Sequence, residues 1–190
     1  MIAVRWTAAT ALGFALAGLI PRCGTGELLL FGAVGAIPQA LALRAERRNA
    51  VIWWFNTAVA VPVAFVFAIL ATVAFAGMAG PPSHLRDLVA LAVGSIVAGF
   101  VVGAFQAIAF SWRAGVRTSL RWSAASAIAG PLAGAFLLGG LYGLFGDCDR
   151  GFPQPALGLV LGAPYGAITG AVLERCLRGT SKGGLDASRT

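Results

Sequence analysis

The stretch "GAIPQALALR", Gly35 to Arg44, places a glutamine beside a proline inside an apolar run that ends at an arginine. Gln39 precedes Arg44 by five residues, or ~7.5 Å along a helix that rises 1.5 Å per residue. An unpaired amide at that depth in an apolar environment costs free energy. The stretch therefore predicts a membrane-spanning helix whose glutamine is paired with a neighbouring helix.

The composition agrees with a membrane protein. Of the 190 residues, 58% are apolar and 11% are charged, and the mean hydropathy is +0.84, which excludes an ordinary soluble surface. We expect an all-α polytopic fold, because backbone groups in lipid must be satisfied within helices and no alternating strand pattern is present. Apolar runs near the ~20 residues needed to cross a bilayer predict six transmembrane helices. They cover 4–21, 27–43, 51–77, 88–111, 122–146 and 156–173.

The domain organisation follows from these runs. Residues 1–178 are expected to form a single transmembrane helical domain, and residues 179–190 a short disordered cytoplasmic tail.

The distribution of positive charge predicts the orientation. The net charge is +7, and eleven of the fourteen basic residues fall on one side of a six-span topology. Because basic residues concentrate in cytoplasmic loops, both termini are expected to be cytoplasmic. Anionic membrane lipids are the expected partners of these residues, and nucleic acid is not. The eleven residues are Arg5, Arg44, Arg47, Arg48, Arg113, Arg117, Arg121, Arg175, Arg178, Lys182 and Arg189.

The first, third and fifth runs share a register when they are aligned on tryptophan. Each tryptophan is followed four residues later by serine or threonine, and then by alanine. We expect the tryptophans to be anchors at one membrane interface, where their amphipathic rings are enriched. The pairs are Trp6 with Thr10, Trp53 with Thr57, and Trp122 with Ser126.

The second, fourth and sixth runs share another register. Gln39, Gln106 and Tyr165 each follow a glycine by seven residues. Together the two registers predict three repeated helical hairpins in a pseudo-threefold bundle.

The two registers place their polar residues at one depth. A glutamine of an even run can then hydrogen-bond a hydroxyl of an odd run. This polar level is either interhelical glue or the lining of a solute path. Its residues are Gln39, Gln106, Tyr165, Thr10, Thr57 and Ser126.

The motifs resemble a group of bacterial multi-pass membrane proteins with repeats of the form GxxxGxxQWLxLR, a short basic loop, and WxxxS. The matching stretches are "GFVVGAFQ" from Gly99, "PQALALR" from Pro38 and "RWSAASA" from Arg121. Here alanine or glycine replaces the tryptophan after the glutamine position, and Tyr165 replaces the third glutamine. The resemblance implies a bacterial inner (plasma) membrane location and carries no activity.

Catalytic chemistry has little support in the sequence. The only histidine, His84, lies in the segment "PPSHLRD", and no acidic residue lies deep in a span. Spaced ligands for a metal and a phosphate-binding glycine loop with its lysine are absent. We therefore expect no enzyme activity, no cofactor and no metal site.

Two classes of function remain open. One is a non-enzymatic accessory, structural or assembly subunit that binds other membrane protein subunits through its small-residue helix faces. The alternative is a channel or carrier for a small neutral solute, which a polar level between proline-kinked helices would suit.

The cysteines leave one further alternative. Cys23 and Cys148 both fall in loops on the side opposite the arginines, whereas Cys176 falls on the cytoplasmic side. If the first and third hairpins are neighbours, the first two cysteines can form a disulfide. The other interpretation is two unpaired thiols in loops.

Overall fold

The computed structural model describes residues 2–20, 27–45, 50–80, 83–144 and 154–186, and these residues form helices without strands. The α4 helix consists of two helices joined at a kink, so the described chain contains six helices. At the kink Gly115 has φ 70° and ψ 169°, a conformation that glycine adopts without a Cβ penalty. We call the parts of α4 before and after Gly115 its first and second halves. The elements are α1 (Ile2–Ala17), α2 (Glu27–Ala45), α3 (Ala50–Met78), α4 (His84–Leu144) and α5 (Gln154–Asp186).

Each of the six expected runs corresponds to one helix, although the lengths differ. Three stretches are long and apolar enough to cross a membrane, namely Ala50–Met78, His84–Ala109 and Pro155–Cys176. The apolar stretches Ile2–Ala17 and Leu28–Arg44 are shorter. With 16 residues, α1 is ~24 Å long, which is less than the ~30 Å of a typical hydrocarbon core.

The C-terminal helix extends further than expected. α5 runs to Asp186, so residues 179–186, which the composition assigned to a disordered tail, are helical in the structure. No proline interrupts this stretch, and adding a residue to an existing helix is far easier than starting a new one.

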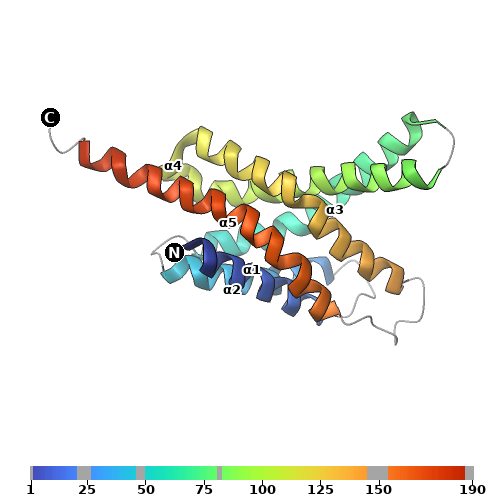
Figure 1. The fold of residues 1–190 in the computed structure, drawn as a ribbon, viewed down its shortest axis with the longest axis horizontal. Coiled ribbons are helices and arrows are strands. Elements are labelled where there is room, and N and C mark those ends of the chain that lie inside the picture. The colour runs from blue at the N-terminus through green and yellow to red at the C-terminus, as the bar shows by residue number, and fades with distance from the viewer. Residues whose placement is uncertain (1, 21–26, 46–49, 81–82, 145–153, 187–190) are drawn as a thin grey trace.

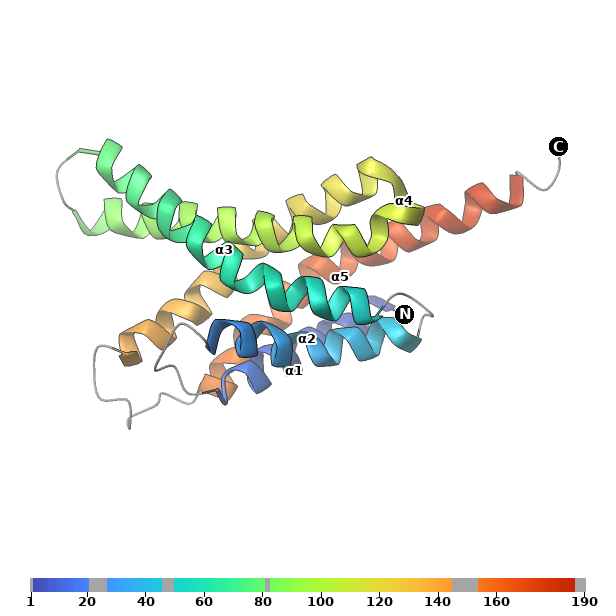
Figure 2. The ribbon, with the colours of Figure 1, turned by 180° about the vertical axis from the view of Figure 1, so that it is seen from behind.

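The helices form a closed ring in chain order. Each helix packs against the next one, and α5 packs back against α1 (Figure 1). The N-terminus, the end of α2, the Gly115 kink and the end of α5 lie at one end of the ring, which we call the arginine end (Arg5, Arg44, Arg117, Arg121 and Arg175). We call the opposite end, where α3 connects to α4, the hairpin end. There the α3–α4 hairpin projects past α1 and α2 (Figure 2).

Glycines set the close approach of neighbouring helices. A Cβ at Gly13 of α1 would collide with the carbonyl oxygen of Gly35 in α2. A Cβ at Gly32 of α2 would lie 3.0 Å from the carbonyl oxygen of Ala58 in α3. Small residues are the usual means by which helices pack in a membrane, where burial in lipid supplies no hydrophobic drive for association.

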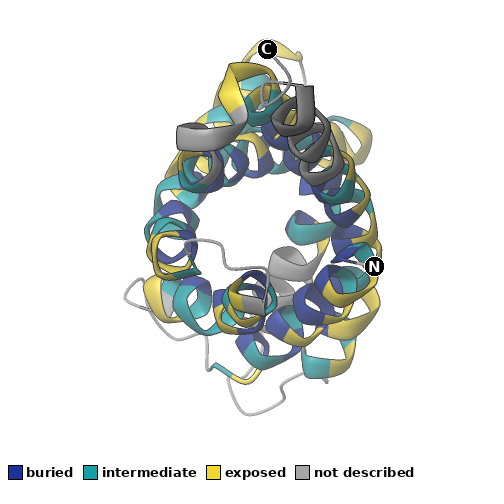
Figure 3. Cartoon of the chain, turned by 90° about the vertical axis from the view of Figure 1, so that its left-hand side faces the viewer, coloured by how far each residue is buried: buried dark blue, intermediate teal, exposed yellow. Residues whose placement is uncertain are grey.

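The distribution of side chains is the reverse of that in a soluble protein. Large apolar residues such as Phe55, Leu70 and Ile128 are exposed on the outside, whereas the buried residues are chiefly alanines, hydroxyl residues, glutamines and tryptophans. Figure 3 shows the exposed residues toward the periphery and the buried residues facing the axis. An exterior this apolar is suited to lipid rather than to water.

Candidate functional site

Three tryptophans meet at the centre of the ring near the arginine end. Trp6 of α1, Trp53 of α3 and Trp122 of the second half of α4 are all buried. Their ring centroids are 5.1 Å, 5.6 Å and 5.4 Å apart, and the interplanar angles of 74° to 82° make every contact an edge-to-face one. Edge-to-face pairs at this distance are favourable because a positive ring edge meets a negative face. We call this cluster the tryptophan triangle.

The triangle corrects one expectation from the sequence. Trp6, Trp53 and Trp122 share a level, since no two centroids differ in depth by more than 5.6 Å. The expectation that they face the lipid headgroups as interface anchors is wrong, because all three side chains are inside the protein. Trp54, the next residue in α3, is the partly exposed tryptophan of this pair.

Two glutamines connect the triangle to the hydroxyl residues. Gln39 accepts a hydrogen bond from Trp53 Nε1 at 3.3 Å and donates one from its Nε2 to Thr10 Oγ1 at 3.1 Å. Gln39 of α2 therefore links α1 and α3, the two helices that flank α2 in the ring.

The second glutamine repeats this arrangement. Gln106 accepts from Trp122 Nε1 at 3.2 Å and donates to Thr57 Oγ1 at 3.1 Å. Thr57 in turn donates to the Trp53 carbonyl oxygen at 2.8 Å. These are two of the glutamine–hydroxyl pairs that the sequence registers predict.

The third position, on α5, is built differently. Trp6 Nε1 donates to Thr169 Oγ1 at 2.9 Å, and Thr169 donates to the Tyr165 carbonyl oxygen at 2.9 Å. Tyr165 lies beside Ser126 and packs on Phe14 with a centroid distance of 5.4 Å. The contact with Ser126 lacks hydrogen-bond geometry, so the buried Ser126 Oγ has no hydrogen-bond partner among the described residues.

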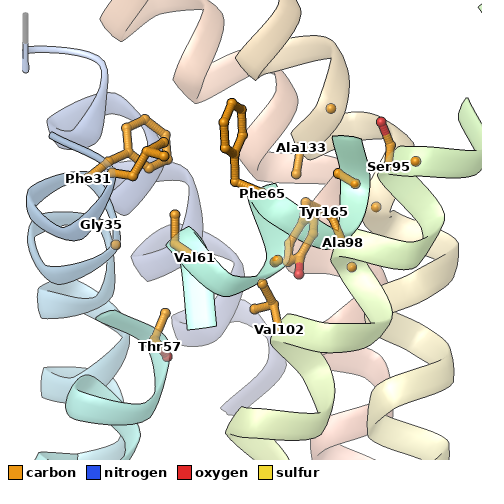
Figure 4. Close-up of a pocket in the computed structure, with 18 of the residues that line it drawn as sticks. Phe31, Gly35, Thr57, Val61, Phe65, Ser95, Ala98, Val102, Ala133 and Tyr165 are labelled. Atoms are coloured by element: carbon orange, nitrogen blue, oxygen red, sulfur yellow. The ribbon is translucent and has the colours of Figure 1, made fainter. Parts of the chain in front are cut away.

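A cavity of about 280 Å³ lies between the helices on the hairpin-end side of the triangle. Its floor, nearest the arginine end, consists of Gln39, Thr57, Gln106 and Tyr165. The walls are mostly glycine, alanine, aliphatic and phenylalanine residues, and they reach Val73 of α3, sixteen residues or ~24 Å from Thr57. In Figure 4 the labelled residues of α2, α3, both halves of α4 and α5 surround this space.

Thr169 and the cavity are two features that were not predicted from the sequence. Thr169 is a buried hydroxyl one turn after Tyr165, so a search for the missing third acceptor in the sixth run would have pointed to it. Asn56 was also not predicted: its Nδ2 donates to the Phe105 carbonyl oxygen at 3.0 Å and so connects α3 to α4. The cavity leaves no comparable signal, because its walls are residues that also occur in ordinary helix packing.

The structure describes only some of the residues on which the cysteine and metal predictions depend. Cys23 and Cys148 lie outside the described residues, and Cys176 is a free, partly buried thiol. Within the described stretches, no three residues among His, Cys, Asp and Glu come together as a possible metal site.

Replacing one hydroxyl on the floor tests the value of the network. We expect Thr57→Val to lower the free energy of unfolding by about 1 to 2 kcal/mol, because it leaves a buried Gln106 N–H without its acceptor. The matched control is Ser126→Ala, at the corresponding position of its run, which removes a hydroxyl without a hydrogen bond and should be close to neutral. Unfolding titrations in mixed micelles measure both values. Equal losses for the two variants would contradict this assignment.

The fold and the site together define a class: an all-helical protein with membrane-compatible helices in a ring around a central, partly open cavity. The chain matches no protein-family model, no curated protein and no solved structure. The resemblance drawn from its sequence motifs therefore stays an expectation.

Proposed function

We propose that the chain is a six-span integral membrane protein of the bacterial inner membrane that binds a small, uncharged, largely apolar molecule in its central cavity. The observation that carries this proposal is the cavity itself, which has apolar walls, a polar floor and a partly open side. Binding sites for small molecules are typically of this kind, with few polar groups that orient the ligand.

The membrane topology has two kinds of support. The exposed surface of the helices is apolar, and the exposed arginines gather at the end where α1 begins and α5 ends. Under the positive-inside rule that end is cytoplasmic. The second half of α4 and the short helices α1 and α2 complete the six spans if the bilayer thins locally around α1 and α2, at a modest cost in free energy.

The proposed pseudo-threefold arrangement of hairpins is supported by repeated contacts. The three tryptophans form nearly equal pairwise contacts, and the two glutamines make the same pair of hydrogen bonds. The glycines of the even register also make equivalent contacts with the helix that follows in the ring. Gly32 faces Ala58, Gly99 faces Ser126, and Gly158 faces Phe14.

The lining favours an uncharged ligand. None of the described residues that line the cavity carries a charge. A charged ligand would leave its hydration shell without an opposite charge to replace it, which is costly in an apolar site. For scale, an engineered apolar cavity of about 150 Å³ binds benzene, so this cavity suits roughly ten to twelve non-hydrogen atoms.

The closed floor favours binding over free passage. The glutamines and the tryptophan triangle fill the centre of the ring at the arginine end of the cavity. A mostly apolar molecule dissolves in a bilayer and crosses it without a pore. A protein cavity for such a molecule therefore serves to bind it selectively rather than to conduct it. A carrier or binding protein fits this geometry better than an open channel.

The proposed role is non-enzymatic, and it replaces the accessory-subunit role as the first choice. The cavity lining that the structure describes contains no carboxylate, imidazole, thiol or amine to act on a ligand. An accessory subunit would use its outer helix faces and would need no internal cavity.

Filling the cavity tests this proposal. Val102 lines the cavity in the first half of α4, whereas Val66 of α3 is exposed on the outside. We expect purified protein to bind tritiated 2-undecanone saturably, at about one molecule per chain. Val102→Trp should abolish that binding and Val66→Trp should retain it, as scintillation proximity measures. Far-ultraviolet circular dichroism checks that both variants are folded. Loss of binding in neither variant would contradict the cavity as the site.

A further inference from the structure

The two glutamines of the cavity floor have hydrogen-bonding capacity that the protein does not use. A primary amide has two N–H donors and one oxygen acceptor with two lone pairs. Gln39 uses one N–H for Thr10 and one lone pair for Trp53. Gln106 uses one N–H for Thr57 and one lone pair for Trp122. Each amide therefore keeps one N–H that has no acceptor among the described residues.

These spare donors lie in an environment where an unpaired N–H is costly. Gln39 is 6% exposed and Gln106 is 4% exposed, and both line the cavity. Buried N–H groups without acceptors are rarer in proteins than carbonyl oxygens with a free lone pair. The floor is therefore better matched to a ligand that accepts hydrogen bonds than to one that donates them.

Apart from the Tyr165 hydroxyl, which can also donate to a ligand oxygen from the same floor, the other polar groups of the lining do not compete for this role. Thr72 donates to the Ala90 carbonyl oxygen at 3.3 Å, and Ser95 donates to the Leu91 carbonyl oxygen at 2.8 Å. Thr57 donates to the backbone of its own helix. Since these hydroxyls have used their one proton, the amides of Gln39 and Gln106 are the spare N–H donors of the described lining.

We propose that Gln39 and Gln106 recognise the carbonyl oxygen of an uncharged, otherwise apolar ligand, such as a long-chain ketone, ester or quinone-like molecule. This inference rests on the proposed binding function of the cavity. A carbonyl oxygen has two lone pairs and accepts from one amide or from both. The apolar walls take the rest of the molecule, and the uncharged lining selects against carboxylates and amines.

A matched pair of probes tests carbonyl recognition separately from the proposed binding of apolar molecules in the cavity. 2-Undecanone and undecane differ by one carbonyl group and have nearly the same size. We expect the ketone to bind the wild-type protein about tenfold more tightly, as one good buried hydrogen bond allows. Displacement of tritiated 2-undecanone gives both affinities. If neither probe binds saturably, the proposed function fails. If both bind with equal affinity, only the carbonyl inference fails.

Glutamate variants remove the spare donor selectively. A neutral carboxyl has one O–H donor and one acceptor, so Gln39→Glu and Gln106→Glu can keep the bonds to threonine and tryptophan while losing the second N–H. At pH 5 we expect the ketone-to-hydrocarbon affinity ratio to fall from about tenfold to near one in the double variant. Each probe partitions into the micelles equally in the wild-type and variant samples, so the change in the ratio does not depend on that partition. A structural defect would weaken both probes alike and leave the ratio unchanged, and that result would overturn the inference.

A measurement without variants covers the case in which the glutamates prevent folding. The infrared carbonyl stretch of ¹³C-labelled 2-undecanone shifts to lower frequency when the oxygen accepts a hydrogen bond. We expect a protein-bound band below the band in empty micelles. A bound ketone with an unshifted band would overturn the inference.

Discussion

Trp53→Ala is expected to lower the free energy of unfolding by about 3 to 5 kcal/mol, the range measured when a large aromatic side chain is removed from a packed core. Trp53 has no exposed surface and contacts the other two tryptophans of the triangle. Its indole N–H also holds Gln39, so the substitution leaves a cavity and removes a hydrogen bond at once. We expect the loss to be accompanied by weaker ligand binding, because the floor of the cavity rests on this cluster.

The neighbouring tryptophan is the control. Trp54 is 37% exposed and donates one hydrogen bond to the Ala33 carbonyl oxygen at 2.8 Å. Trp54→Ala should therefore cost only about 1 kcal/mol. Unfolding titrations in mixed micelles compare the two variants in the same helix. A loss for Trp54→Ala as large as that for Trp53→Ala would contradict the assignment of Trp53 to the core.

Gly158→Val is expected to destabilise the protein by about 3 kcal/mol, at the upper end of the range for overpacking. A Cβ at Gly158 would lie 2.5 Å from the Phe14 carbonyl oxygen and 2.8 Å from the Ala15 amide nitrogen. These are backbone atoms, which cannot move aside as a flexible side chain can. Because Gly158 lies where α5 meets α1, the substitution opposes closure of the ring.

Gly77→Val provides the matched control. A Cβ at Gly77, near the end of α3, has no atom within 4 Å. Valine has a higher helix propensity than glycine, so this variant should be neutral or slightly stabilising. Thermal unfolding followed by circular dichroism distinguishes the two. Equal stability of Gly158→Val and the wild type would mean that α5 does not pack on α1 at this glycine.

The sequence alone determined the helices and the depth of their polar residues. Depth follows from residue spacing, because every residue of a helix adds the same rise. The registers that contain Gln39 and Thr10, or Gln106 and Thr57, therefore predicted pairs that the structure brings within 3.1 Å. The approximate bounds of the helices could also be predicted, because the extent of an apolar run is visible in the sequence itself.

The tertiary structure decided which way each side chain faces. These helices are apolar on all sides, so periodicity does not distinguish a face toward lipid from a face toward other helices. Trp53 and Trp54 are adjacent and chemically identical, yet one is buried in the triangle and the other is partly exposed. Likewise, Thr169 accepts from Trp6 only because α5 closes the ring against α1. The cavity has the same origin: its volume is the space that remains when all the helices have packed, and no single stretch of sequence contains it.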